Sequence, residues 1–121
     1  MSYPNELFYT PDHVWIKENG DTILIGITDF AQDQLGEILF VDLPEAGKAF
    51  EAGKVIIEIE SQKTSSELTI PFGCEIVAVN EELDDSPELI NEDAYANWIA
   101  EVKVSEALSG LLNAADYEAG L

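Results

Sequence analysis

The chain has 121 residues, enough for one domain with one core, and its hydrophobic fraction of 46% is ordinary for a globular protein. Acidic residues number 25 against five lysines, so the net charge of −20 disfavours binding to nucleic acid or to an anionic membrane and attracts basic proteins. A single cysteine, Cys74, excludes an internal disulfide, and the absence of a signal-peptide pattern at the start predicts a cytoplasmic protein.

Short apolar alternations separated by turn residues predict a mostly β chain. Residues 14–17 and 22–27 flank the pair Asn19-Gly20, which is a strong hairpin signal. Further strands are predicted over residues 38–42, 55–60, 67–70, 75–79 and 98–104. The chain therefore reads as a β-sandwich or flattened barrel.

Small helices accompany these strands. Asp29 and Gln32 have the spacing of an N-cap and its N3 partner, which predicts a helix of one or two turns that Gly36 would end. Two further short helices, capped by Ser105 and Asn113, are predicted to close the chain. The acidic run over residues 81–93 is turn-rich and reads either as a solvated surface or as a docking face.

Lys63 is the lysine whose position is most informative. In the strand before it, Val55, Ile57 and Ile59 share one face, so the chain enters the next turn with its core face well defined. Residues 61–66 contain no large apolar side chain, which places Lys63 at an exposed hairpin tip. An accessible amine held by two strands suits a modifying enzyme, although most lysines in polar turns are plain surface residues.

The residues around Lys63 resemble the lipoyl-domain pattern, in which two glycine turns precede an apolar strand, an acidic residue precedes the lysine and a proline follows it. The corresponding residues are Gly47, Gly53, Glu60, Lys63 and Pro71. A biotinyl domain would flank its lysine with methionines, whereas Gln62 and Thr64 stand here, so lipoate is the better cofactor. The resemblance implies that a lipoate ligase or lipoyl transferase recognises the attachment turn through Glu60, Ser61, Gln62 and Thr64.

Longer segments resemble the glycine cleavage system H-protein family. They are YTPDHVW, IGITDFAQDQLGEILFVDLPEAG, ESQK and SPELINEDAY, and they extend over essentially the whole chain. The resemblance implies a single lipoyl/biotinyl-type barrel-sandwich hybrid over residues 1–121, with short accessory and C-terminal helices. It also implies a carrier rather than an enzyme, with lipoate amide-linked to Lys63 and with the glycine cleavage P, T and L proteins as partners.

No catalytic constellation of the chain's own is visible, because histidine occurs once and arginine is absent. No metal-ligand cluster is visible either. A dithiol arm brings its own reactive groups, so a carrier needs only attachment, reach and docking surfaces. We expect such a carrier to be a monomer.

Three positions depart from the family pattern. Val14 replaces a glutamate that the family associates with the amino group of aminomethyl cargo, Cys74 replaces a glycine, and the glycine before Trp98 is missing. Valine cannot pair with an ammonium group, so we favour a sulfur-oxidation intermediate handled with a heterodisulfide-reductase-like complex. The glycine cleavage H protein itself, carrying the aminomethyl group, is the alternative, and a non-lipoylated scaffold or regulatory protein is the second.

Candidates for docking the arm are His13, Val14, Phe30 and Cys74. The family resemblance places the groove for the loaded arm near Phe30. Three of these candidates also have a plain structural explanation: His13 as a packed residue beside Trp15, Cys74 as a small buried hydrophobe, and Phe30 as part of a core cluster with Leu35, Ile38 and Phe40.

Overall fold

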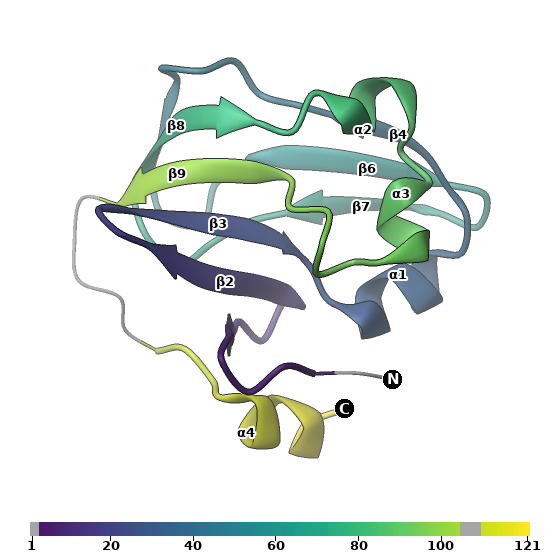
Figure 1. Ribbon diagram of the computed structural model, residues 1–121, viewed down its shortest axis with the longest axis horizontal. Helices are drawn as coiled ribbons and strands as arrows, with labels where there is room; N and C mark the ends of the chain where they lie inside the picture. Colours follow the sequence, from purple (N-terminus) through teal and green to yellow (C-terminus); the bar gives the residue numbers. More distant parts are fainter. Residues whose placement is uncertain (1–2, 105–109) are drawn as a thin grey trace.

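The computed structural model describes residues 3–104 and 110–121, and over these residues the chain forms two antiparallel sheets with four short helices (Figure 1). The elements in chain order are β1 (Phe8–Tyr9), β2 (Val14–Asn19), β3 (Thr22–Ile27), α1 (Asp29–Leu35), β4 (Ile38–Asp42), β5 (Ala49–Phe50), β6 (Ile57–Ser61), β7 (Ser65–Leu68), β8 (Cys74–Val79), α2 (Glu82–Asp85), α3 (Leu89–Glu92), β9 (Ala100–Val104) and α4 (Ala114–Ala119). The larger sheet has the order β1-β2-β3-β9-β8-β5 and the smaller one β4-β6-β7. The predicted mostly β fold with short helices is confirmed.

The β2–β3 hairpin follows the sequence prediction closely. Asn19 pairs with Thr22 across the turn, and Gly20 has a φ of +67°, a conformation that glycine adopts without strain. Trp15 lies opposite Gly26, and its indole ring occupies the space where a Cβ on Gly26 would stand, with Cε2 only 2.6 Å from that point. Glycine at position 26 therefore makes room for the tryptophan.

The main core fills the space between the two sheets. Val14, Ile16 and Ile25 enter it from the larger sheet, and Ile57 and Ile59 enter it from the smaller one, all of them essentially inaccessible to water. This separation of faces is the expected result of period-two alternation in both sheets.

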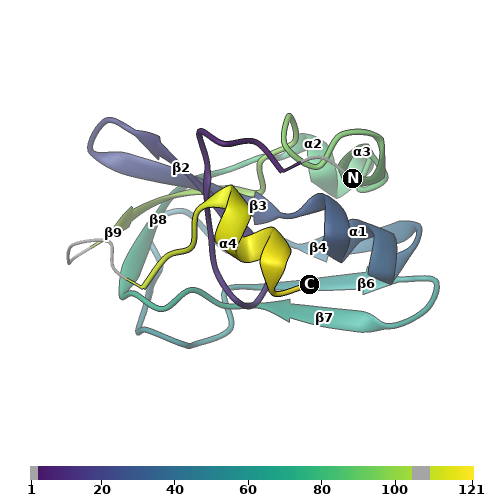
Figure 2. The same ribbon diagram turned by 90° about the horizontal axis from the view of Figure 1, so that it is seen from below.

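A second apolar cluster joins the far side of β1 and β2 to α4. Figure 2 looks onto the side of the molecule on which α4 lies. Tyr117 of α4 stacks on Tyr9 with ring centroids 4.8 Å apart, and Trp15 belongs to the same cluster. The predicted cap of this helix is confirmed, because the Asn113 side chain accepts a hydrogen bond from the Asp116 N–H. Ser105, the predicted cap of the other C-terminal helix, lies outside the described residues.

The α1 prediction was wrong about its first residue. Thr28, not Asp29, is the N-cap, and its buried hydroxyl accepts from the Ala31 N–H. Asp29 instead accepts a hydrogen bond from the Gln32 side chain at 2.8 Å. Gly36 ends the helix as predicted, with a φ of +76°.

Strands 22–27 and 38–42 were predicted with their observed bounds, and each of the other predicted strands differs by one or two residues at one or both ends. Four elements were not predicted: β1, β5, α2 and α3. The two helices lie in the acidic run, where Leu83 and Ile90 are fully buried and tie the run to the core while its carboxylates face outward. Next to them, the Asn97 side chain donates to the carbonyls of Leu89 and Asp93 where the family's glycine is missing.

Phe40 is not part of the core, contrary to prediction. Ile38 pairs with Ser61 and Phe40 with Glu60, so Leu39 is an extra residue in β4 that makes a β-bulge. The bulge shifts the alternation, and Ile38 and Val41 face inward while Leu39 and Phe40 face solvent. Phe30, also expected in that cluster, is only half-buried.

Candidate functional site

The Lys63 hairpin is closed by hydrogen bonds between Ser61 and Thr64. The Ser61 N–H donates to the Thr64 carbonyl at 2.9 Å, and the Ser61 hydroxyl donates to the same oxygen at 2.7 Å. The Thr64 N–H donates back to the Ser61 hydroxyl at 3.3 Å. Gln62 and Lys63 are thereby held at the tip between β6 and β7, and both are exposed. The predicted exposed hairpin position of Lys63 is confirmed.

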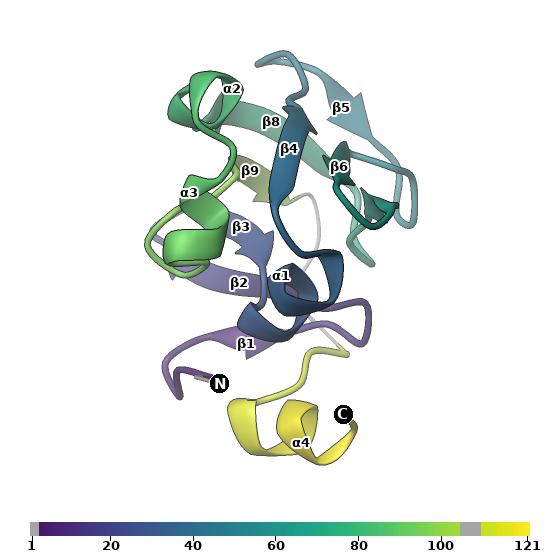
Figure 3. The same ribbon diagram turned by 90° about the vertical axis from the view of Figure 1, so that its right-hand side faces the viewer.

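The tip also rests on the corner between α1 and β4. The Gln62 N–H donates to the Glu37 carbonyl at 3.1 Å. The stem of Lys63 crosses Gly36, such that a Cβ on Gly36 would lie 3.4 Å from Lys63 Cε and 3.7 Å from its Cγ. Gly36 therefore forms a shallow cradle on which the lysine stem rests at van der Waals distance, and its φ of +76° is what favours glycine here. Figure 3 looks onto the end of the molecule where α1, α3, β4 and the hairpin meet.

Asn91 of α3 braces this corner, a role that the sequence did not predict. Its side-chain amide donates to the Gly36 carbonyl at 2.8 Å and to Gln32 Oε1 at 3.0 Å. Its oxygen accepts from the Ile38 N–H at 2.9 Å. The only signal in the sequence is an asparagine between Ile90 and an acidic pair, which does not reveal a contact made more than 50 residues away.

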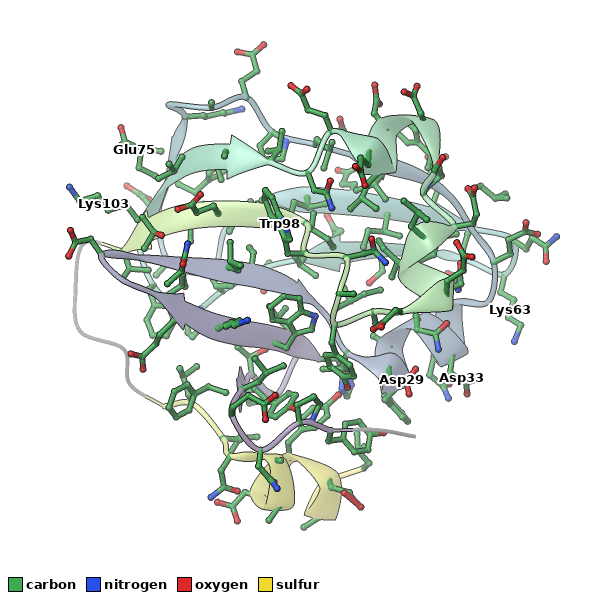
Figure 4. All side chains as sticks on the ribbon, in the orientation of Figure 1. Asp29, Asp33, Lys63, Glu75, Trp98 and Lys103 are labelled. Carbon is green, nitrogen blue, oxygen red and sulfur yellow. The ribbon has the colours of Figure 1, made fainter. Side chains whose placement is uncertain are left out.

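Two acidic side chains of α1 lie on the same side of the molecule as Lys63. Figure 4 shows Asp29 and Asp33 at the same end of the molecule as Lys63, with Asp33 the nearer of the two to the lysine in this view. Asp33 is exposed and Asp29 half-buried. A long arm attached to Lys63 and lying along α1 would pass these carboxylates.

His13 is fixed by a small polar network at the start of β2. Its φ is +69°, and its Nδ1 lies 2.7 Å from the Tyr117 hydroxyl, which also lies 2.7 Å from the Thr28 hydroxyl. The Phe30 ring packs on the imidazole with centroids 4.8 Å apart. Burial lowers the pKa of His13, and nearby Asp12 opposes this effect. His13 and Phe30 thus lie together at the start of α1.

Val14 and Cys74 are not exposed on the side of the molecule that presents Lys63, Phe30 and His13. Val14 is fully buried and points into the main core. Cys74 is 5% exposed at the start of β8, next to Glu75, and Figure 4 shows Glu75 at the opposite end of the molecule from Lys63. Burial raises the pKa of the Cys74 thiol to about 11, so it stays protonated at neutral pH.

Across the described ranges, no group of three or more His, Cys, Asp and Glu side chains is arranged to hold a metal ion. Over the same ranges, none of the helices has the length and apolar character needed to span a bilayer. What the surface does present is a single fixed amine at the tip of a tight hairpin on a two-sheet β fold. This combination defines a lipoyl-type carrier domain.

Comparisons with known proteins identify the family. The sequence profile described as "Glycine cleavage H-protein" matches residues 7–121, so the chain belongs to the glycine cleavage H-protein family. It is 47% identical over 116 residues to the glycine cleavage system H protein of Herpetosiphon aurantiacus, covering 95% of this chain and 90% of that one. It is 50% identical over 124 residues to the H protein of Listeria welshimeri, covering 100% and 99%.

A solved structure agrees with these sequence relatives. The crystal structure of the glycine cleavage system H protein from Mycobacterium marinum has a TM-score of 0.88 and 39% identity, covering 98% of this chain and 99% of that one. Proteins of this family are carriers rather than enzymes, and their cofactor is a covalently attached lipoate. The predicted carrier class and cofactor are therefore confirmed.

Proposed function

We propose that this chain serves as the H protein of a glycine cleavage system, with lipoate amide-linked to Lys63 and with the aminomethyl group of glycine as its cargo. The observation that carries this proposal is the position of Lys63, exposed at the tip of a braced hairpin with its stem across Gly36. The relatives from Herpetosiphon aurantiacus and Listeria welshimeri, which match over nearly their full length, are named glycine cleavage system H proteins, and this supports the same cargo.

The residues around Lys63 fit a lipoyl group. The stem of Lys63 lies flat against Gly36 at the end of α1, within van der Waals distance, before the arm continues outward. The hairpin bonds of Ser61 and Thr64 fix the direction in which the stem leaves the protein. When bound, lipoate supplies a dithiol that holds the cargo. The protein supplies the attachment point and the surface against which the arm rests.

The position of Val14 weakens the case for a sulfur cargo. That case depended on Val14 standing where a carboxylate would meet the amine of the cargo. Val14 is instead packed in the core opposite Ile27, so this residue does not select a cargo on the outer surface. No other observation favours a sulfur intermediate or a heterodisulfide-reductase-like partner.

Acidic groups for an amine cargo are present elsewhere. Asp33 and Asp29 of α1 lie on the Lys63 side of the molecule, and both precede the glycine on which the lysine stem rests. A protonated amine brought along α1 by the arm would be attracted to these carboxylates. His13 and Phe30 lie at the far end of the same path and form part of the proposed resting surface.

The proposed partners follow from this assignment. A lipoate ligase or lipoyl transferase would modify Lys63, and the glycine cleavage P, T and L proteins would load, unload and reoxidise the arm. The remaining residues of the attachment turn, Glu60, Ser61, Gln62 and Thr64, are exposed or half-exposed and are available to the modifying enzyme.

A two-stage mass measurement tests the proposal. First, the unmodified protein, Lys63→Ala and Lys54→Ala are incubated with lipoate, ATP and a lipoate–protein ligase, and intact mass is recorded. We expect a lipoyl mass gain in the parent and in Lys54→Ala, and none in Lys63→Ala. An unmodified parent would instead support a scaffold role.

In the second stage, the lipoylated protein is offered glycine with the glycine cleavage decarboxylase, and in parallel thiosulfate with a sulfur-oxidising extract. An aminomethyl adduct on the Lys63 peptide is the expected result. Sulfur-bearing adducts without aminomethylation would contradict the proposed cargo while leaving the carrier role intact.

A further inference from the structure

Two adjacent apolar side chains are exposed close to the Lys63 hairpin. Leu39 is 55% exposed and Phe40 is 44% exposed. Both belong to β4, whose only strand neighbour within the described residues is β6, the strand that leads to Lys63. Phe40 pairs with Glu60, three residues before Lys63, so this apolar pair adjoins the base of the hairpin.

The exposure of Phe40 is a property of the backbone. Ile38 is 1% exposed and Val41 is fully buried, so two residues separate successive inward side chains where regular alternation would leave one. Leu39 is the extra residue of the bulge. β-Bulges redirect side chains and occur beside functional sites, and this one directs an aromatic ring into solvent.

Carboxylates surround the apolar pair. A depression of about 420 Å³ separates β4 from the α2 region, and Phe40 lies on its wall. The acidic residues that line the same depression are Asp42, Glu81, Asp84 and Asp85. Glu37 and Glu60 are exposed on the side toward the hairpin. A surface that fits this face must offer an apolar centre and basic residues around it.

We propose that Leu39, Phe40 and this acidic rim form the docking surface for the enzyme that attaches lipoate to Lys63. That enzyme must bring Lys63 Nζ into its own active site, so it has to contact the protein immediately around the hairpin. Enzymes that act later meet the dithiol at the far end of the arm. The inference depends on Lys63 being the attachment lysine, as proposed above, but it is independent of the cargo.

The reaction at this surface is acyl transfer from lipoyl-adenylate. Lipoate and ATP first give lipoyl-adenylate and pyrophosphate. The unprotonated Lys63 Nζ then attacks the acyl carbon, a C–N bond forms, the C–O bond to AMP breaks, and the nitrogen loses a proton. AMP leaves with the electron pair of the broken bond, and no oxidant or reductant takes part. Docking at Leu39 and Phe40 would orient the hairpin for this attack.

Steady-state lipoylation of the unmodified protein tests the docking surface. Leu39→Ser, Phe40→Ser and the double variant are compared with Val77→Ser, a control at an equally exposed valine, 44% accessible, on β8 of the other sheet. We expect the ligase KM for the double variant to rise about tenfold with kcat nearly unchanged, as for truncation of an interface hot spot. The control should keep the parent KM. Thermal unfolding of each variant verifies the fold.

Charge provides a second readout. The double variant Asp84→Asn, Asp85→Asn and the single variant Leu39→Lys should both raise KM, and KM of the parent should rise with salt. An unchanged KM in the Leu39 and Phe40 variants would overturn the proposal, as would an equal rise in Val77→Ser. If the Leu39 and Phe40 variants were lipoylated normally but loaded poorly by the glycine decarboxylase, the surface would belong to that enzyme and the proposal would be overturned. If the parent protein were lipoylated normally but never aminomethylated, only the proposed cargo would be contradicted.

Discussion

The stem of Lys63 lies across Gly36, with 3.4 Å, an ordinary van der Waals distance, between Lys63 Cε and the point where a Cβ on Gly36 would stand. Gly36 also has a φ of +76° with a ψ of −153°, a combination essentially restricted to glycine. The residue that ends α1 thus shapes the base of the lysine arm.

Gly36→Ala is expected to affect both stability and modification. The backbone strain should lower the free energy of unfolding by about 1–3 kcal/mol. The added methyl group would make only ordinary van der Waals contact with the lysine stem, so we expect lipoylation to slow because relief of the strain shifts the end of α1 on which the stem rests. Gly53→Ala is the matched control, because Gly53 has a φ of +78° but no atom within 4 Å of its Cβ position. Urea denaturation and ligase kinetics measure the two effects. Equal lipoylation rates in both variants would contradict a role for Gly36 in placing the arm.

Asn91→Ala should loosen the corner on which the hairpin rests. The change removes three hydrogen bonds and leaves the Gly36 carbonyl and the Ile38 N–H without their partner, at a cost of about 2–3 kcal/mol. Asn91→Asp is the informative companion, because it keeps an acceptor for Ile38 and loses the donor to Gly36. We expect its unfolding free energy, measured in urea, to fall between those of the parent and Asn91→Ala. If Asn91→Ala matched the parent, the bracing role would be wrong.

His13 should make stability depend on pH. Its folded-state pKa is lowered by burial from the ordinary value of 6.5, so the unfolded chain binds the proton more readily than the folded one. The contribution of neutral, buried His13 to the free energy of unfolding is fully present above pH 6.5. It is lost as the pH falls from 6.5 through the lower folded-state pKa.

Unfolding free energies of the parent and of His13→Asn, measured from about pH 8 to about pH 5, isolate this effect, because asparagine tolerates a positive φ. The advantage of the parent over the variant should shrink as the pH falls. If the difference in unfolding free energy between the parent and His13→Asn did not change with pH, His13 would not be the source of a pH-dependent stability.

Cys74 should be inert in the folded protein. It is the only cysteine, and burial raises the pKa of its thiol to about 11, so roughly one molecule in a thousand carries the thiolate at pH 8. We expect iodoacetamide to alkylate the unmodified chain slowly in buffer and rapidly in urea, as followed by intact mass. Rapid alkylation of the folded protein would show that Cys74 is accessible and reopen its candidacy as a residue that meets the arm.

Local sequence signals predicted the parts of the fold that local interactions determine. The Asn19-Gly20 turn, the β4 strand and the polar tip at Lys63 all carry their structural information within a few residues. The two-residue strands β1 and β5 carry none, because they exist only through pairing with β2 and β8. The N-cap of α1 was assigned one residue late because Thr28 and Asp29 are both good caps, and the buried contact with Tyr117 that favours Thr28 is distant in sequence.

In the candidate site, too, features set by nearby residues were predictable and features set by distant contacts were not. The hairpin and its lysine could be read from the alternation of β6, whereas Asn91 and the Gly36 cradle depend on contacts between separate elements. Phe40 was placed in the core because strict alternation predicts it there, and a bulge leaves no reliable mark in one sequence. Val14 was read from its family position rather than from its strand, whose period already places it with Ile16 in the core.

The exposed pair Leu39 and Phe40 lies on a strand that pairs on one edge only, as far as the described residues show, and this combination favours pairing between copies of a chain. A net charge of −20 on every copy opposes such encounters, since like charges repel over about 8 Å at physiological salt. The same charge draws a basic partner toward this face. The negative charge therefore both keeps copies of the protein apart and attracts basic partners. Concentrated salt screens the charges, so it should weaken the repulsion between copies as well as the attraction to a partner.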